Sequence, residues 1–149
     1  MKKDLEILEE SEVFSQVPIT VRAARLRHAR YDDTMSEELV RLRVDRGDSI
    51  AAIVHDTQFD VLLLAEQFRY PTIGAGSGWV LELSAGNVDR GEVPEVTLER
   101  ELLEELGVRA TSYEFVATFF LSPGISSERI HLYYVPIDKD ALEESGGGV

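Results

Sequence analysis

The segment PEVTLERELLEELG, residues 94–107, constrains the fold of this chain more than any other stretch of its sequence. Pro94 suits the first turn of a helix, and Gly107 suits the position just after the last turn. Leucines recur every four residues between them, which is the spacing of one helical face: Leu98, Leu102 and Leu106. The segment therefore predicts an amphipathic helix over 94–106 that packs its leucines against the rest of the protein.

The same helix carries a cluster of acidic residues. Glu101, Glu104 and Glu105 share one side of it, and such carboxylates repel each other by roughly 0.2–0.5 kcal/mol per pair. The chain already has 28 Asp and Glu against 15 Lys and Arg, a formal net charge of −13. Carboxylates are hard oxygen ligands that suit Mg²⁺ or Mn²⁺, so the cluster indicates a cation site, with a solvated acidic helix face as the alternative.

The residues upstream of the helix complete a specific spacing. Residues 86–108 read GNVDRGEVPEVTLERELLEELGV: Gly86, five residues, Glu92, seven residues, then Arg100-Glu-aliphatic-x-Glu-Glu-x-Gly-aliphatic. This pattern resembles the Nudix box with every defining position filled. At a frequency of about one in fifteen per specified residue, chance would produce it roughly once in 10⁸ to 10⁹ start positions. The chain is therefore similar to the Nudix hydrolases.

The resemblance implies a role for each residue of the box. Glu101 and Glu105 would be the principal metal ligands and catalytic residues, and Glu104 would bind an additional ion. The backbone carbonyl of Ala85 is implied as a further ligand, and Arg100 as the catalytic-site arginine that orients the glutamates by ion pairing. The implied cofactor is Mg²⁺, with Mn²⁺ as the alternative. Structural roles are implied for Gly86 in a tight loop and for Gly107 as a helix stop, and a role in local structure, or alternatively in metal contact, is implied for Glu92.

The flanks of the box narrow the resemblance. EQFRYP (66–71) and WVLELSAG (79–86) are similar to segments of the ADP-ribose and nucleotide-sugar pyrophosphatases, although Ser84 stands where that group carries proline. FFLSPGISSERIHLYYV (119–135) resembles the same group's Ser-Pro-Gly loop and the strand after it. The implied reaction is Mg²⁺-dependent hydrolysis of ADP-ribose to AMP and ribose 5-phosphate. The alternatives are GDP-mannose or another nucleoside-diphosphate sugar as substrate, and a non-catalytic module that binds ADP-ribose.

Further residues outside the box acquire roles by the same resemblance. Arg69 would contact substrate phosphate, while Glu128 and Ser122 would line the nucleoside or sugar pocket. A strand-end ion pair for Arg69 and a solvated position for Glu128 are the alternatives. The group forms homodimers in which the N-terminal strands of one subunit reach over the partner's site. Basic side chains such as Arg27 and Arg43 would then complement the substrate phosphates, the alternative being outward-facing strand residues.

Relatives of this kind continue, beyond the point equivalent to Val149, through an acidic loop that supplies the general base. The Nudix domain of this sequence is therefore expected to be truncated at its C-terminus. Glu144 is the candidate for the base within the sequence, and a residue beyond Val149 is the other.

The expected fold class is α+β, an α/β/α sandwich in which a mixed sheet is flanked by helices. The expected domains are an N-terminal antiparallel strand segment over 1–46, for dimerisation and substrate binding, and a Nudix hydrolase domain over 47–149. Trp79 is expected in the core. Period-two alternation and apolar runs predict strands at residues 19–30, 38–44, 49–56, 61–70, 79–83, 112–121 and 129–136. A Gly-rich loop at 71–78 is expected between the fourth and the fifth of them.

Composition excludes several classes of protein. The chain contains no cysteine, which excludes disulfide frameworks and thiolate chemistry. Its negative charge disfavours nucleic acids and anionic membranes as partners. A small nucleoside diphosphate is the partner that the resemblance to the Nudix hydrolases implies. Without a signal-like start or a long apolar run, a cytoplasmic location is expected.

Overall fold

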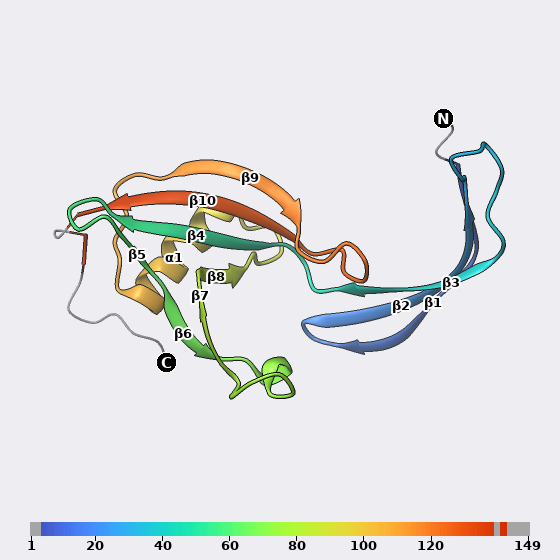
Figure 1. The fold of residues 1–149 in the computed structure, drawn as a ribbon, viewed down its shortest axis with the longest axis horizontal. Coiled ribbons are helices and arrows are strands. Elements are labelled where there is room, and N and C mark those ends of the chain that lie inside the picture. Colours follow the sequence, from blue (N-terminus) through green and yellow to red (C-terminus); the bar gives the residue numbers. More distant parts are fainter. Residues whose placement is uncertain (1–3, 139–140, 143–149) are drawn as a thin grey trace. The chain divides into compact units, whose positions relative to one another are not determined.

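The structure, a computed structural model, describes residues 4–138 and 141–142 and divides into two compact units (Figure 1). The first unit contains the residues up to Gly47 together with Phe120–Glu128. The second contains Asp48–Phe119 and the described residues from Arg129 onward, 129–138 and 141–142. The expected functional division into 1–46 and 47–149 stays a prediction.

The first unit is built on a three-stranded antiparallel sheet in the order β1-β2-β3. Strands β2 (Ile19–His28) and β3 (Leu39–Asp45) confirm the two strands that the alternating pattern predicts. Strand β1 (Leu5–Gln16) was not predicted, because its sequence LEILEESEVFSQ is acidic and lacks a regular period of two. Pairing with β2 decides its conformation, and cross-strand ion pairs accompany that pairing: Glu6–Arg27, Glu9–Arg25 and Glu10–Arg22.

The second unit contains a mixed five-stranded sheet. Strand β4 (Ser49–Asp56) lies inside it, parallel to β10 (Arg129–Ile137) and antiparallel to β5 (Val61–Leu63) and β8 (Ser84–Asn87). Strand β9 (Glu114–Phe120) lies beside β10. The predicted strands at 49–56, 112–121 and 129–136 are confirmed. Strand β8 was not predicted. It contains Gly86, so the motif over residues 86–108 begins on the sheet.

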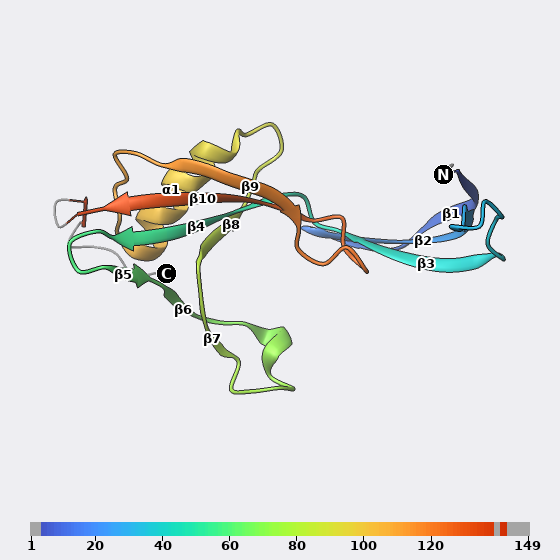
Figure 2. The same cartoon turned by 45° about the horizontal axis from the view of Figure 1, so that its top comes forward.

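A separate two-stranded hairpin interrupts this order. The predicted strand 61–70 breaks at Leu64, and the chain continues as β6 (Ala65–Phe68), which pairs with β7 (Trp79–Glu82). A short 3₁₀ helix at Tyr70–Thr72 lies in the loop between them. The hairpin extends away from the layers formed by α1 and the large sheet (Figure 2). The prediction of a core position for Trp79 is therefore wrong: 60% of this residue is exposed.

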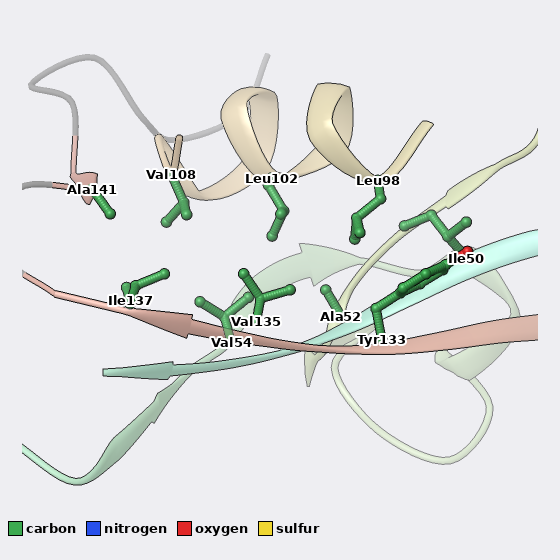
Figure 3. Packing of buried hydrophobic residues seen from close by; sticks show 10 residues of the cluster. All are labelled: Ile50, Ala52, Val54, Leu98, Leu102, Val108, Tyr133, Val135, Ile137 and Ala141. Atoms are coloured by element: carbon green, nitrogen blue, oxygen red, sulfur yellow. The ribbon is translucent and has the colours of Figure 1, made fainter. Parts of the chain in front are cut away.

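Helix α1 (Pro94–Leu106) covers one face of the large sheet and confirms the helix that the leucine spacing predicts. Gly107 ends it in the left-handed conformation, φ 63°, where a glycine carries no steric penalty. The leucine face packs on β4 and β10, and each fully buried leucine contributes about 1.5–3 kcal/mol. The core that results (Figure 3) consists of Ile50, Ala52, Val54, Leu98, Leu102, Val108, Tyr133, Val135, Ile137 and Ala141.

The α+β class and the mixed sheet are thus confirmed. The expected sandwich has helices on both faces of the sheet. Within the described part of the chain α1 is the one α-helix, so only one of these two helical layers is described. No helix among the described residues is long and apolar enough to cross a membrane.

Candidate functional site

The acidic side of α1 faces a cavity of about 780 Å³. Glu101, Glu104 and Glu105 form part of its wall. The hairpin β6–β7 and its approach form the rest, through Leu64, Ala65, Glu66, Gln67, Phe68 and Trp79, with Leu106 at the end of the helix. The cavity lies wholly within the second unit and has the size of a small-molecule site.

Glu101 lies directly over the backbone of Gly86 in β8. A Cβ placed on Gly86 would lie 2.1 Å from Glu101 Oε1 and 2.5 Å from its Cγ. The sequence predicts a tight loop at Gly86. The structure instead places Gly86 in strand β8, and its φ is not in the left-handed region. The glycine is therefore required for the close approach of a carboxylate, and not for turn geometry.

Arg100 forms the ion pairs that the sequence predicts for it. Its Nη1 donates to Glu101 Oε1 at 2.7 Å and lies 3.5 Å from Glu104 Oε2. One guanidinium thus lies between two of the three carboxylates. The pair with Glu101 is the more sheltered, because the Glu101 side chain is only 13% exposed whereas that of Glu104 is 56% exposed.

Glu105 is held by two strands. The side-chain amide of Gln67 on β6 donates to its Oε1, and the backbone N–H of Ala85 on β8 donates to its Oε2 at 3.2 Å. The sequence did not predict a role for Gln67. The sequence could have indicated this role, because Gln67 lies two residues before Arg69 in the segment Gln-aromatic-Arg that resembles the pyrophosphatase group.

The electrostatics of the site disfavour its negative charge. Burial, and then the neighbouring charges of Glu105 and Glu104, raise the pKa of Glu101, while Arg100 opposes the rise. A cation beside these carboxylates would favour their ionised forms, so the acidic cluster suits a positively charged ligand.

Glu92 lies near the start of the helix. Its carboxylate accepts a hydrogen bond of 2.5 Å from the hydroxyl of Thr97, a fully buried residue of α1. This contact links the loop that enters the helix to the first helical turns. The arrangement is compatible with the structural role implied by the sequence.

The residues present fit a hard divalent cation. Among residues 4–138 and 141–142, no group of three or more His, Cys, Asp or Glu side chains is arranged so that it could hold a metal ion by itself, as a metal cage would. Mg²⁺ does not need one, because it is usually held by one or two carboxylates with water and substrate phosphates. Glu101 and Glu105 supply such oxygens on one cavity wall, and the space above Gly86 is shaped to the Glu101 carboxylate.

Arg69 lies just after β6, and its guanidinium donates to Glu82 Oε1 through both Nε, at 2.8 Å, and Nη2. The hydrogen bond with Glu82 raises the pKa of Arg69, although burial opposes the rise. The ion pair considered as an alternative is therefore present. A phosphate-binding role for Arg69 stays a prediction.

The other predicted substrate residues belong to the first unit. The Nη1 of Arg27 lies 4.0 Å from Oε2 of Glu6. The backbone carbonyl of Ser122 accepts hydrogen bonds from the backbone N–H groups of Ile125 and Ser126 in the same loop. Glu128 is buried, 5% exposed, which excludes a solvated position. The binding roles of these residues and of Arg43 stay predictions. Glu144, the candidate base, lies outside the described residues.

Comparison with known proteins gives relatives along most of this chain. A GDP-mannose pyrophosphatase of Cronobacter sakazakii is 35% identical over 130 residues, which are 83% of this chain and 68% of that protein. An ADP-ribose pyrophosphatase of Haemophilus influenzae is 33% identical over 144 residues, 92% of this chain and 64% of that protein. This chain thus spans about two thirds of the length of these curated relatives.

A solved structure of an ADP compounds hydrolase superposes with a TM-score of 0.68 at 20% identity, covering 97% of this chain and 75% of that one. At this identity the match establishes a shared fold. The family model of the NUDIX domain matches residues 45–147, which span the helix, the acidic cluster and the whole five-stranded sheet. The chain therefore belongs to the NUDIX domain family.

Proposed function

We propose that this chain catalyses the divalent-metal-dependent hydrolysis of the pyrophosphate of ADP-ribose, giving AMP and ribose 5-phosphate. The observation that carries the proposal is the placement of Glu101, Glu104 and Glu105 together on the wall of one cavity, with Arg100 and Gln67 fixing their orientation. Relatives named ADP-ribose pyrophosphatase support the substrate.

Glu101 and Glu105 would hold Mg²⁺, with the Ala85 carbonyl as a further ligand and Glu104 binding an additional ion. When bound, the metal would polarise the phosphoryl oxygens and lower the pKa of the attacking water. The protein's own contribution is positioning: Arg100, Gln67 and the Ala85 N–H restrict the carboxylates before substrate arrives. Such preorganisation is a major component of catalysis of phosphoryl transfer.

The metal assignment is tested by Glu105→Gln, which keeps the size of the side chain and removes its charge. Turnover with Mg²⁺ should fall by orders of magnitude while the far-UV circular dichroism stays unchanged. Glu99→Gln is the matched control, because Glu99 lies on the same helix, is exposed and does not line the cavity. Near-wild-type turnover by Glu105→Gln would refute the assignment.

GDP-mannose, or another nucleoside-diphosphate sugar, is the second candidate substrate. It is favoured by relatives named GDP-mannose pyrophosphatase, whose identity to this chain reaches 35%. Separate incubation with ADP-ribose and with GDP-mannose, each with Mg²⁺, followed by chromatography of the nucleotide products, compares the two. A kcat/KM higher for GDP-mannose would reverse our order of preference. Binding of ADP-ribose without turnover of either compound would instead identify a non-catalytic module.

We also propose that the chain forms a homodimer through its first unit. A single three-stranded sheet needs a partner to cover its apolar face, and this one exposes Phe14, Val40 and Leu42, which the strand pairing places on the same face. A second copy of the chain would cover them. The absence of nucleic-acid partners and the cytoplasmic location stay predictions.

Light scattering of the purified protein tests the dimer. The wild type should have twice the chain mass, and Val40→Glu combined with Leu42→Glu should have the mass of one chain. Arg41→Gln is the control, because successive strand residues point to opposite faces of the sheet. A monomeric wild type at micromolar concentration would contradict the dimer.

A further inference from the structure

Two aromatic side chains form a part of the cavity wall that the metal assignment does not use. Phe68 is 50% exposed and Trp79 is 60% exposed, and both line the same cavity as Glu101 and Glu105. Aromatic rings carry a large apolar surface that is favourable to remove from water. The cavity therefore joins a carboxylate surface to an apolar one. With a divalent cation held at the carboxylates, as proposed above, its occupant should carry both a phosphate group and a flat apolar group.

The hairpin holds these two rings in a defined arrangement. Phe68 and Trp79 are directly opposite each other in the β6–β7 pairing, with ring centroids 5.8 Å apart and ring planes at 65°. Such an edge-to-face contact supports one ring while leaving the face of the other free. The backbone N–H of Arg69 donates to the carbonyl of Gly78 at 2.6 Å, next to the pair.

Gly78 makes room for this arrangement. Its φ of +88° favours glycine, and a Cβ there would lie 2.6 Å from Cε2 of Phe68. The Phe68 ring thus lies against bare backbone, next in the chain to Trp79. The aromatic pair is held in place by the hairpin, although half or more of each residue is exposed.

We propose that Trp79, supported by Phe68, is the stacking surface for the purine base of the nucleoside diphosphate whose pyrophosphate lies at Glu101 and Glu105. This inference rests on the proposed function and adds a base subsite to it. A cavity of about 780 Å³ accommodates a dinucleotide-sized ligand. Stacking is tolerant of base identity because every base has a π face, so this surface would accept adenine and guanine alike.

Trp79 is the single tryptophan of the chain, so intrinsic fluorescence reports directly on the proposed subsite. We would titrate the wild-type protein, with Mg²⁺ present, with AMP, ribose 5-phosphate and inorganic pyrophosphate in turn. AMP should quench Trp79 saturably, and the two ligands without a base should not. Quenching by ribose 5-phosphate equal to that by AMP, or calorimetric binding of AMP without a fluorescence change, would overturn the proposal.

Substitutions separate stacking from general packing. Trp79→Leu should raise KM for ADP-ribose by roughly five- to hundredfold, the fold-change that corresponds to one stacked base, with kcat changed less than KM. Trp79→Phe retains a ring and should recover most of the affinity. Leu81→Ala is the matched control, because Leu81 is exposed on the same strand but does not line the cavity. An unchanged KM in Trp79→Leu would refute the stacking role.

The outcomes also distinguish this inference from the proposed function. If AMP quenches Trp79 but ADP-ribose is not hydrolysed, the subsite stands and the hydrolytic function fails. If ADP-ribose is hydrolysed and Trp79→Leu is indistinguishable from wild type, the function stands and the subsite fails. A change from dimer to monomer in Trp79→Leu, seen by light scattering, would assign Trp79 to a subunit interface and overturn the proposal.

Discussion

Replacement of Gly86 by alanine is the most informative perturbation of this site. The new Cβ would meet Glu101 at 2.1 Å from Oε1, 2.2 Å from Cδ and 2.5 Å from Cγ, where ordinary contacts begin at 3.4 Å. The Glu101 side chain must therefore retreat by about 1 Å or more. It can do so by rotating, because it is a flexible side chain and not backbone.

The magnitude of the effect follows from this displacement. A misplacement of about 1 Å in a catalytic constellation can cost about 10²-fold in rate. Stability should change little, because Gly86 has no left-handed φ, and alanine at a compatible position gains about 0.4–1 kcal/mol through the unfolded state. We expect kcat to fall by about 10²-fold and the Mg²⁺ concentration at half-maximal rate to rise, at a nearly constant melting temperature.

The assay is ADP-ribose hydrolysis as a function of Mg²⁺ concentration, with circular dichroism to monitor the fold. Gly76→Ala is the control, because a Cβ at Gly76 has nothing within 4 Å and the backbone there is not left-handed. A Gly86→Ala protein with kcat within about twofold of wild type would show that the close approach to Glu101 has no functional consequence.

Three further predictions concern single side chains. Gln67→Leu removes a donor to Glu105, so the Mg²⁺ concentration at half-maximal rate should rise several-fold in activity titrations; an unchanged value would contradict a positioning role. Ser84 has a fully buried hydroxyl without a partner among the described residues, so Ser84→Ala should raise the unfolding free energy by about 1 kcal/mol in urea titrations, and a loss of stability would contradict this. Burial and the hydrogen bond to Glu95 raise the pKa of Tyr133, so the folded state keeps a proton that the unfolded state loses above about pH 10. Stability conferred by Tyr133 is thus complete below that pH and falls by about 1.4 kcal/mol per pH unit above it, so the difference from Tyr133→Phe should shrink between pH 9 and 11; a constant difference would contradict the shift.

Features encoded by local sequence were predictable. Helix 94–106 follows from the spacing of leucines, Pro94 at its start and Gly107 at its end, all of which act within one or two turns. The clustering of Glu101, Glu104 and Glu105 follows from the helical period, and the spacing from Gly86 to Gly107 was sufficient to identify the family.

Features that depend on distant pairing were not predictable. Strand β1 has no clear period of two and is exposed along its whole length, so only its pairing with β2 shows that it is a strand. Trp79 was expected in the core because of its apolar character. Its exposure results from the departure of β6 and β7 from the large sheet, which a single apolar run does not reveal.

The sequence alone determined that this chain has an amphipathic acidic helix over 94–106 and, through the spacing of its glycines, arginine and glutamates, that it belongs to the NUDIX domain family; the hard-cation site is predicted from the same residues. Its charges and periodicities act over a few residues, so no tertiary information was needed to read them. Only the tertiary structure decided which strands meet this helix. It brought Gln67 to Glu105, Gly86 beneath Glu101 and Trp79 to the cavity wall, because contacts between residues far apart in sequence depend on strand pairing and packing.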